Sequence, residues 1–324
     1  GRCFGIGHRI RLTELSGVLI SPVHLPPPAG PGDRIGVAAL SGPVDPEKLE
    51  RGLDALRRLG FAPVLAGNLG SRHGFFAGTD AERLDAFHRL AADPDLPAIV
   101  FARGGYGLTR LLPAIDWDLL ARRPRAYVGY SDVTPFLLGV IERLGLAAFH
   151  GPMVAAELGR GLTPDEEESF LGALAGRYPR AEPFRSCLKN GGPVSGPLLG
   201  GCLSLLVATL GTPFFPDLGG SLLFWEEVNE DPYRVDRMLT HLRLSGNLAG
   251  IAGMIVGHLG HTEGSGEPSE ERAWEALVDD SLAGFPWPLA WGLDSGHLRP
   301  NHTLPLGLLA RLDAGAAQVV LGEG

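Results

Sequence analysis

The chain alternates two kinds of segment from residue 33 onward. Short apolar runs predict strands, and longer segments with apolar residues at helical spacing predict helices. In the first half, we expect strands at 34–40, 62–67, 98–102 and 126–130, and helices at 46–60, 80–93, 108–123 and 133–144. The helix at 80–93 opens on an aspartate N-cap, and the one at 108–123 contains Pro113 as a candidate break. This alternation predicts a parallel sheet covered by helices.

The alternation weakens between residues 175 and 197, a stretch rich in Pro, Gly and Arg that is typical of a linker. Beyond it, helices are expected at 201–211, 232–246 and 268–284, and strands at 221–225, 253–257, 288–292 and 316–322. The predicted fold is therefore α/β. An N-terminal extension (1–28) precedes a Rossmann-like domain with a parallel sheet (29–174), a linker (175–197) and a smaller C-terminal α/β domain (198–324).

The composition excludes several classes of protein. A net charge of -9 argues against a nucleic-acid-binding surface, and no apolar run is long enough to span a membrane. Cys3, Cys187 and Cys202 form no CxxC motif, which argues against both a disulfide framework and a structural zinc site. The first 28 residues lack the pattern of a signal peptide. We therefore expect a cytoplasmic protein without nucleic-acid or membrane partners.

Residues with catalytic chemistry follow three of the predicted strands. Ser131 and Asp132 come directly after 126–130, Glu226 and Glu227 after 221–225, and His297 shortly after 288–292. Because open parallel sheets bind ligands at the carboxyl ends of their strands, a serine, an acid and a histidine are expected on one edge.

A glycine-rich segment, Arg103 to Gly107 (RGGYG), follows the strand before the serine. A right-handed crossover brings both strand ends to the same edge of the sheet. The backbone N–H groups of Gly105 and Asp132 are then candidate donors of an oxyanion hole for acyl transfer.

Each of these features also has a structural interpretation. Ser131 is a suitable helix cap, and RGGYG is a tight turn or a weak phosphate loop. Glu226 and Glu227 could simply be exposed to solvent at the end of a strand. A single histidine such as His297 is more often structural than catalytic. His258 and His261 suggest a metal pair, but spacing offers no third ligand and no metal is expected.

Two motif comparisons narrow the choice. GIGHRI at 5–10 lacks the third glycine of a dinucleotide fingerprint and follows no predicted strand. Val133 stands where the GxSxG elbow needs its second glycine. The serine therefore does not belong to an ordinary α/β-hydrolase elbow.

Taken in order, the motifs resemble the LD-carboxypeptidase family of serine peptidases, which includes the microcin C immunity peptidases. The resemblance covers residues 25–322. Each of its sequence motifs is weakly specific alone, but their order along the chain is strongly specific: PPPAGPGDRIGVAALSGPV, FARGGYG, RAYVGYSDVTPFL, FHGPM, LLGGCLSLLVATLGTPF, LLFWEEVNEDPYRVDRMLTHL and SGHLRPNHTLPLG.

The resemblance implies a catalytic triad of Ser131, His297 and Glu226, with Gly105 and Asp132 as the backbone oxyanion donors. It implies an active site at the interface between two domains, a homodimer and no cofactor. The implied activity is hydrolysis of the amide before a C-terminal D-amino acid, typically D-Ala of murein tetrapeptide during cytoplasmic cell-wall recycling. The immunity branch instead cleaves aminoacyl-nucleotide amides.

The substrate and its contacts are less constrained. Arg103 and Arg234 are candidates to bind the free carboxylate of a peptide. Arg125 and Cys202 depart from the lysine and asparagine common in the family, and both are expected near the site. In the nucleotide-cleaving branch of the family, aromatic residues from the segment corresponding to 159–190 tend to hold the base. Residues 159–190 contain no tryptophan, so the resemblance favours a murein peptide over a nucleotide. A general amide hydrolase and a non-catalytic peptide-binding homologue are the remaining alternatives, although all three triad positions are filled.

Overall fold

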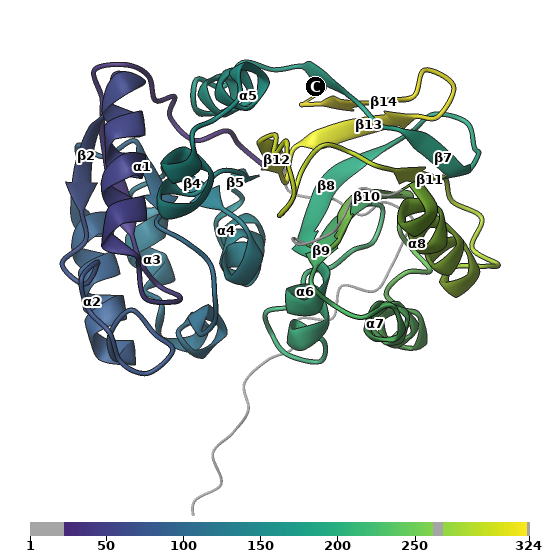
Figure 1. Ribbon diagram of the computed structural model, residues 1–324, viewed down its shortest axis with the longest axis horizontal. Coiled ribbons are helices and arrows are strands. Elements are labelled where there is room, and N and C mark those ends of the chain that lie inside the picture. The colour runs from purple at the N-terminus through teal and green to yellow at the C-terminus, as the bar shows by residue number, and fades with distance from the viewer. Residues whose placement is uncertain (1–22, 262–267, 323–324) are drawn as a thin grey trace, which may run out of the picture.

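The computed structural model describes residues 23–261 and 268–322, which form two lobes lying side by side (Figure 1). The strands of the N-terminal lobe are β1 (Arg34–Ala38), β2 (Ala62–Leu65), β3 (Ala98–Phe101), β4 (Ala126–Gly129), β5 (Ala148–His150) and β12 (Leu304–Leu306). They form a six-stranded sheet in the order β12-β5-β4-β3-β1-β2. All pairings are parallel except that of β12 with β5. A short segment of the C-terminal half thus completes the N-terminal sheet.

The helices of this lobe are α1 (Pro46–Arg58), α2 (Asp80–Ala92), α3 (Trp117–Ala121), α4 (Thr134–Leu144) and α5 (Pro164–Leu174), with the short turns η1 (Leu108–Arg110), η2 (Leu112–Ala114), η3 (Ser131–Val133) and η4 (Val154–Leu158). Two sequence expectations were wrong. Residues 108–123 form two short turns and α3 instead of one helix, with Pro113 inside η2. The N-cap of α2 is Thr79, not Asp80, because Thr79 and Glu82 form a reciprocal capping box.

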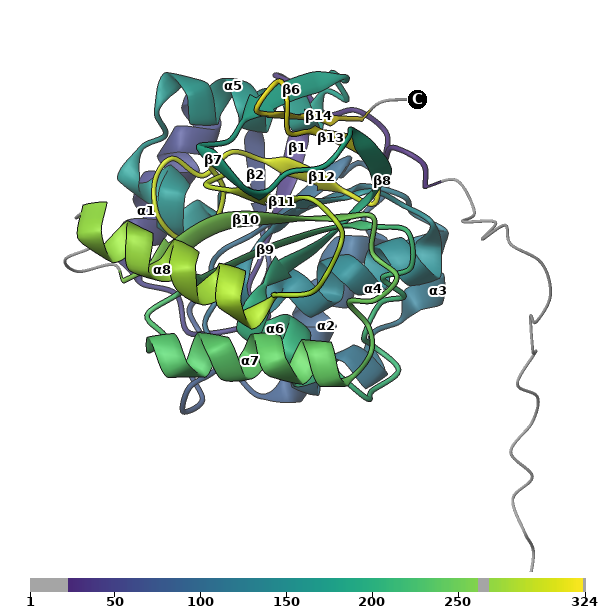
Figure 2. The same cartoon turned by 90° about the vertical axis from the view of Figure 1, so that its right-hand side faces the viewer.

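The C-terminal lobe is built on a second sheet. Its strands are β6 (Arg180–Pro183), β7 (Ser186–Lys189), β8 (Val194–Cys202), β9 (Leu222–Val228), β10 (Gly253–Gly260), β11 (Leu289–Trp291), β13 (Leu309–Asp313) and β14 (Gln318–Leu321). They form an eight-stranded sheet in the order β6-β14-β13-β8-β9-β10-β11-β7. The helices are α6 (Leu203–Thr209), α7 (Pro232–Leu244) and α8 (Pro268–Ser281), and α7 and α8 run along the same side of β9 and β10 (Figure 2).

The segment 175–197, expected to be a linker, instead contains β6, β7 and the beginning of β8. β6 and β7 are the two edge strands of the eight-stranded sheet. Edge strands tolerate proline because one side of the backbone needs no ladder partner. The Pro- and Gly-rich composition that suggests a linker is therefore compatible with strands at these positions.

The turn that carries Ser131 is flanked by buried strands and a buried helix. β3 and β4 are buried along their whole length, as is α4 from Thr134 to Ile141. The ring of Phe136 on α4 meets Phe87, Phe101 and Tyr127 edge-on, with centroids 5.2 to 5.5 Å apart. Burying one such ring contributes roughly 1.5–3 kcal/mol. This packing fixes the strand and the helix that flank Ser131.

Part of the expected extension belongs to the N-terminal lobe. The N–H of His24 donates to Gly145 O at 2.9 Å, and the N–H of Ala147 donates to His24 O at 2.9 Å. Residues 1–22, which include Cys3 and the GIGHRI motif, lie outside the described residues. Within the described ranges, no helix combines the length and the apolar character needed to cross a membrane.

Candidate active site

Ser131 lies on a sharp turn between β4 and α4. Its φ angle is 63°, in the left-handed region that side chains other than glycine rarely adopt. This conformation costs about 1–2 kcal/mol, and such strain concentrates at functional sites. The residues on either side, Tyr130 and Asp132, are both buried. The turn therefore presents the serine at the carboxyl edge of the sheet.

The structure brings Ser131, His297 and Glu226 together from three separate parts of the chain. His297 Nε2 lies 3.0 Å from Ser131 Oγ, and His297 Nδ1 lies 2.7 Å from Glu226 Oε2. The backbone N–H of His297 also donates to Glu226 Oε2 at 3.1 Å. Glu226 and Glu227 lie within β9, not after it as expected, because the strand extends to Val228. The arrangement is a continuous contact path from hydroxyl to imidazole to carboxylate.

The electrostatics of the histidine–glutamate pair favour an imidazolium held by a carboxylate. Burial opposes protonation of His297, but the charge and hydrogen bond of Glu226 outweigh it and raise the pKa of His297. Burial by itself raises the pKa of Glu226, yet the interactions with His297 dominate and lower it. Glu226, which is fully buried, therefore stays ionised beside His297.

The raised pKa of His297 predicts the pH dependence of a reaction in which His297 serves as the general base for Ser131. A histidine that accepts the serine proton must be neutral, so activity is lost as the pH falls through its pKa. Because that pKa is raised, the acid limb of kcat/KM should lie above the ordinary histidine value of about 6.5. A pH–rate profile measures it directly, and an acid limb at or below that value would contradict the proposed partnership with Glu226.

The glycine loop after β3 contacts the serine turn closely. A Cβ on Gly104 would lie 2.7 Å from Ser131 Cβ, so only glycine permits this approach. The Asp132 carboxylate accepts the N–H of Leu108 at 2.9 Å and ties the end of the loop to the turn. The N–H groups of Gly105 and Asp132 donate to no acceptor that the structure describes. Both are thus available for a ligand.

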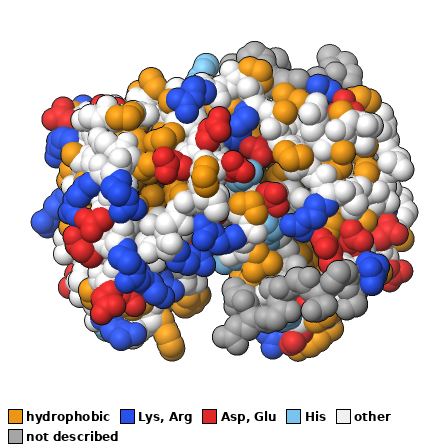
Figure 3. All heavy atoms as spheres, turned by 45° about the horizontal axis from the view of Figure 1, so that its top comes forward, with side chains coloured by type: hydrophobic (Ala, Val, Ile, Leu, Met, Phe, Trp, Pro, Cys, Tyr) orange, Lys and Arg blue, Asp and Glu red, His pale blue; other side chains and the backbone are white. Residues whose placement is uncertain are grey.

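A cavity of about 390 Å³ opens beside Ser131 and His297. Arg103, Lys48 and Arg160 line it, together with Asp45 and Glu157. Acidic, basic and histidine side chains are visible between the two lobes (Figure 3). The cations come from different elements of the N-terminal lobe, and no local motif in the sequence signals Lys48 or Arg160.

The two arginines predicted to contact substrate differ in position. Arg103 lines the cavity and donates to the carbonyl of Pro43 at 3.2 Å. Arg234 lies on α7, pairs with Glu230 and Asp231, and does not line the cavity. The structure therefore brings Arg103, but not Arg234, to the serine.

Tyr130 supports the imidazole from one side. Its ring meets the ring of His297 edge-on, with centroids 4.8 Å apart. Its hydroxyl donates to Glu157 Oε1 at 2.8 Å, and the same oxygen pairs with Arg160. Glu157 is buried, so this pair also fixes a cation at the rim of the cavity.

The loop that carries His297 is held against the N-terminal lobe by a second buried carboxylate. Arg299 Nη2 lies 2.6 Å from Glu166 Oε2, and the N–H of Asn301 donates to Glu166 Oε1 at 2.9 Å. The side chain of Asn301 in turn accepts the N–H of Gly296 at 3.0 Å. Glu166, at the start of α5, therefore positions residues on both sides of His297.

The two departures from the family pattern lie in different places. Cys202 is buried, faces Glu226 across the β8–β9 ladder, and its Sγ lies 3.5 Å from Glu227 Oε2. Arg125 lies just before β4, at the opposite end of the strand from Ser131, where it donates to the carbonyl of Ala91 at 2.8 Å. The expectation that Arg125 lies near the site is therefore wrong, because its side chain binds the last turn of α2.

The His258 and His261 motif shows no metal-binding arrangement. His258 lies within β10 and is buried. Among the residues described, no three or more His, Cys, Asp or Glu side chains are placed to share a metal ion.

Comparison with known proteins identifies a family over both lobes. Residues 35–151 match the LD-carboxypeptidase N-terminal domain, and residues 195–312 match the LD-carboxypeptidase C-terminal domain. The chain belongs to the LD-carboxypeptidase family. It is therefore an enzyme, a hydrolase of the serine carboxypeptidase class.

Individual LD-carboxypeptidase relatives match nearly the whole chain. The "Probable murein peptide carboxypeptidase" of Bacillus subtilis (strain 168) is 34% identical over 298 residues, 90% of this chain and 92% of the relative. The solved structure of muramoyltetrapeptide carboxypeptidase from Oxalobacter formigenes is 31% identical, with a TM-score of 0.80 over 90% of this chain and 99% of that one. A structure of MccF in complex with glutamyl sulfamoyl guanosine is 26% identical, with a TM-score of 0.83 over 94% and 99%.

Proposed function

We propose that the protein is a serine LD-carboxypeptidase that hydrolyses the amide before a C-terminal D-amino acid of a murein peptide. The observation that carries this proposal is the contact path from Ser131 Oγ through His297 to the buried carboxylate of Glu226. Serine is a weak nucleophile until a base removes its proton, and the base needs an acid to fix its tautomer.

In the first half of the reaction, His297 Nε2 takes the proton of Ser131 Oγ while the oxygen attacks the scissile carbonyl carbon. The resulting oxyanion accepts hydrogen bonds from the backbone N–H groups of Gly105 and Asp132. The imidazolium, stabilised by Glu226, then gives its proton to the leaving amine. The C–N bond breaks, the D-amino acid departs, and the acyl group stays on Ser131.

In the second half, water replaces the leaving amine. His297 removes a proton from the water as it attacks the ester carbon, and Ser131 Oγ regains a proton as the C–O bond breaks. The remaining peptide leaves with a free carboxylate, and the enzyme returns to its starting protonation state.

The charges around the cavity support a substrate with a free carboxylate. Lys48, Arg103 and Arg160 line it, and only Arg160 forms an ion pair with another lining residue, Glu157. A carboxypeptidase needs cationic donors for the terminal carboxylate, and planar guanidinium groups bind carboxylates well. We assign Arg103 and Lys48 to this role.

The similarity to the MccF structure, which holds a glutamyl sulfamoyl nucleoside, favours one alternative substrate class: aminoacyl-nucleotide amides. The deciding experiment compares D-Ala release from a murein tetrapeptide with cleavage of an aminoacyl-sulfamoyl adenosine. The proposal predicts a much higher kcat/KM for the tetrapeptide. Preferential cleavage of the nucleotide would replace the murein assignment with an immunity-type activity.

The setting of the reaction is also part of the proposal. Cys187 and Cys202 are free thiols, which suits the reducing cytoplasm, where recycling of murein peptides would take place. The family resemblance favours a homodimer. Sedimentation of the purified protein in an analytical ultracentrifuge distinguishes a homodimer from a monomer.

A further inference from the structure

His150 is a buried histidine that the proposed mechanism does not use. It is the last residue of β5, where the sheet register places it beside Gly129 of β4, two residues before Ser131. The side chain is fully buried, and neither ring nitrogen has a hydrogen-bond partner among the described residues. Because nearly all buried polar groups in folded proteins have a partner, an imidazole without one indicates a role that packing does not explain.

The ring of His150 lies next to the row of side chains that includes Glu226. It meets the ring of Phe224 edge-on, with centroids 5.1 Å apart. Side chains two residues apart on a strand point to the same face, so Phe224 and Glu226 are neighbours on β9. The ring of Tyr130 packs against both histidines, with centroids 5.4 Å from His150 and 4.8 Å from His297. His150 therefore belongs to the buried wall behind the proposed triad.

The carboxylate of Glu226 also has an oxygen without a partner. Oε2 accepts the backbone N–H of His297 and lies 2.7 Å from His297 Nδ1. Oε1 is buried and accepts no hydrogen bond within the part of the chain that the structure describes. Burying a charged group is costly unless its oxygens accept hydrogen bonds. Glu226 Oε1 thus needs a donor from the same buried wall.

The charge state of His150 suits that need. Burial lowers the pKa of His150 to about 4, although the charge of Glu226 acts in the opposite direction. Burial raises the pKa of Glu226, and the charges of His297 and His150 lower it. The two groups are therefore close enough to influence each other, and His150 is neutral near pH 7. A neutral imidazole carries one N–H donor, which complements the free acceptor Oε1.

The other ionisable groups around His150, Glu226 and His297 come from several elements: Tyr130, Glu157, Cys202, Glu227 and His258. Most of them already have partners. The hydroxyl of Tyr130 donates to Glu157 at 2.8 Å, and Glu227 accepts the N–H of Ser204 at 2.7 Å. The thiol of Cys202 contacts Ser204 Oγ at 3.3 Å. None of these four side chains is thus free to serve Glu226 Oε1.

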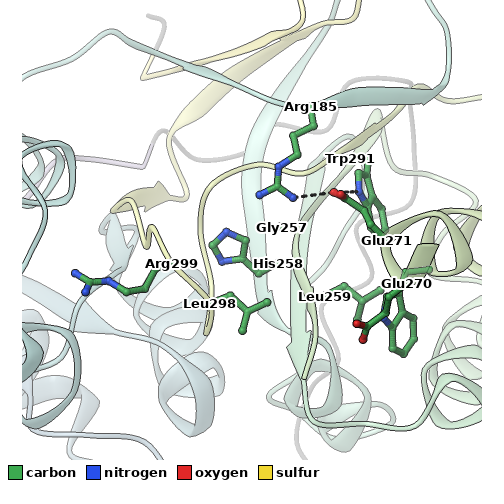
Figure 4. A pocket seen from close by; sticks show the side chains of 10 residues that line it. Arg185, Gly257, His258, Leu259, Glu270, Glu271, Trp291, Leu298 and Arg299 are labelled. Carbon is green, nitrogen blue, oxygen red and sulfur yellow. Dashed lines mark hydrogen bonds and ion pairs between the residues drawn. The ribbon is translucent and has the colours of Figure 1, made fainter. Parts of the chain in front are cut away.

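His258 faces a different space. It lines a separate cavity between β10, α8 and β11, together with Arg185 and Leu298 (Figure 4). Asp294 Oδ1 lies 3.6 Å from its Nε2. Among the described neighbours of Glu226, His150 is therefore the side chain with an uncommitted donor.

We propose that His150 is a positioning residue that donates a hydrogen bond to Glu226 Oε1, directly or across one bridging water. With Oε1 held, the carboxylate plane is fixed and Oε2 stays directed at His297 Nδ1. The inference rests on the proposed function, because it assumes that His297 serves as the base for Ser131.

The test begins with His150→Phe, which removes the donor but keeps a ring between Tyr130 and Phe224. Because it also removes an unpartnered polar group from the interior, its Tm should stay within about 5 °C of the wild type. The loss of a hydrogen bond to a charged group should lower kcat for D-Ala release by about tenfold or more, with KM unchanged.

The same variant should raise the pKa of His297 by roughly one unit. Without the donor, the ionised carboxylate of Glu226 is stabilised less when His297 is neutral, so protonation of the pair becomes more favourable. NMR titration of protein labelled with ¹⁵N-histidine measures this pKa without any substrate. The His297 signal is identified by its absence from His297→Ala.

Two further variants ask which nitrogen of His150 is the donor. His150→Gln places an amide N–H near the position of Nε2, and His150→Asn places one near Nδ1. The variant that matches the donating nitrogen should keep the wild-type pKa of His297 and most of the activity, and the other should resemble His150→Phe. This pair also decides the inference if His150→Phe does not fold.

Tyr127→Phe is the matched control, because it too removes a buried polar atom without a partner from the same sheet. It should leave kcat and the pKa of His297 unchanged. A His297 pKa that is the same in the wild type and in all three His150 variants would overturn the inference and leave the proposed function standing. If the wild type released no D-Ala, the proposed function would fail, and the NMR titration would still decide the inference.

Discussion

Replacing Ser131 by alanine is expected to lower kcat for D-amino-acid release by at least about 10⁴-fold. The variant lacks the oxygen that forms the acyl-enzyme, and His297 Nε2 loses the partner 3.0 Å away. The residual rate would come from the backbone donors and from substrate positioning. Substrate binding should change little, because the cations of the cavity rim remain. Single-turnover release of D-Ala, with binding measured separately, checks both parts.

Ser71→Ala is a suitable control for that comparison. Ser71 also lies in the N-terminal lobe, but it does not line the cavity beside Ser131. Its variant should keep the kcat of the wild type. A Ser131→Ala variant that retains most of its activity would show that another group is the nucleophile.

Replacing Glu226 by glutamine is expected to lower kcat by about 10⁴-fold. The amide has nearly the same shape, but it cannot stabilise an imidazolium as the carboxylate does. Its NH₂ group also competes for Nδ1 and favours the wrong histidine tautomer. Because the Glu226 charge raises the pKa of His297, the acid limb of the remaining activity should move to lower pH. A pH–rate profile of the variant measures both effects.

Glu227→Gln is the matched control on the same strand. Glu227 is buried and accepts the N–H of Ser204 at 2.7 Å, a contact that a glutamine oxygen can also make. Its variant should keep kcat within about tenfold of the wild type. Equal losses in the two variants would mean that Glu226 serves a general structural role and not the orientation of His297.

The sequence predicts the N-terminal sheet well because its signals are local. β3 and β4 are apolar runs buried on both faces, and the amphipathic helices between them follow a regular spacing. The right-handed crossover rule then brings RGGYG and Ser131 to one edge without further information. The same logic placed Glu226 and His297 near strand ends, although β9 extends through Glu226.

Other features depend on contacts that no local pattern encodes. β6 and β7 are strands because β14 and β11 offer them ladder partners, although their own composition suggests a linker. β12 joins the other lobe through β5. The sequence alone gives no reason to expect that pairing.

The side chains around the triad show the same limit. Glu166 reaches the His297 loop through Arg299 from a position 133 residues away. Lys48 and Arg160 meet at the cavity only because α1 packs against η4. Their roles follow from the fold, and neither has a motif that could reveal it beforehand.

The most direct test of the central claim is covalent labelling with a fluorophosphonate, a reagent that phosphonylates activated serines. Mass spectrometry of the digested protein should find the modification on Ser131, in proportion to the loss of activity, and His297→Ala should abolish it. Complete loss of activity with Ser131 unmodified, or equal labelling of the His297→Ala variant, would contradict the proposed activation of Ser131 by His297.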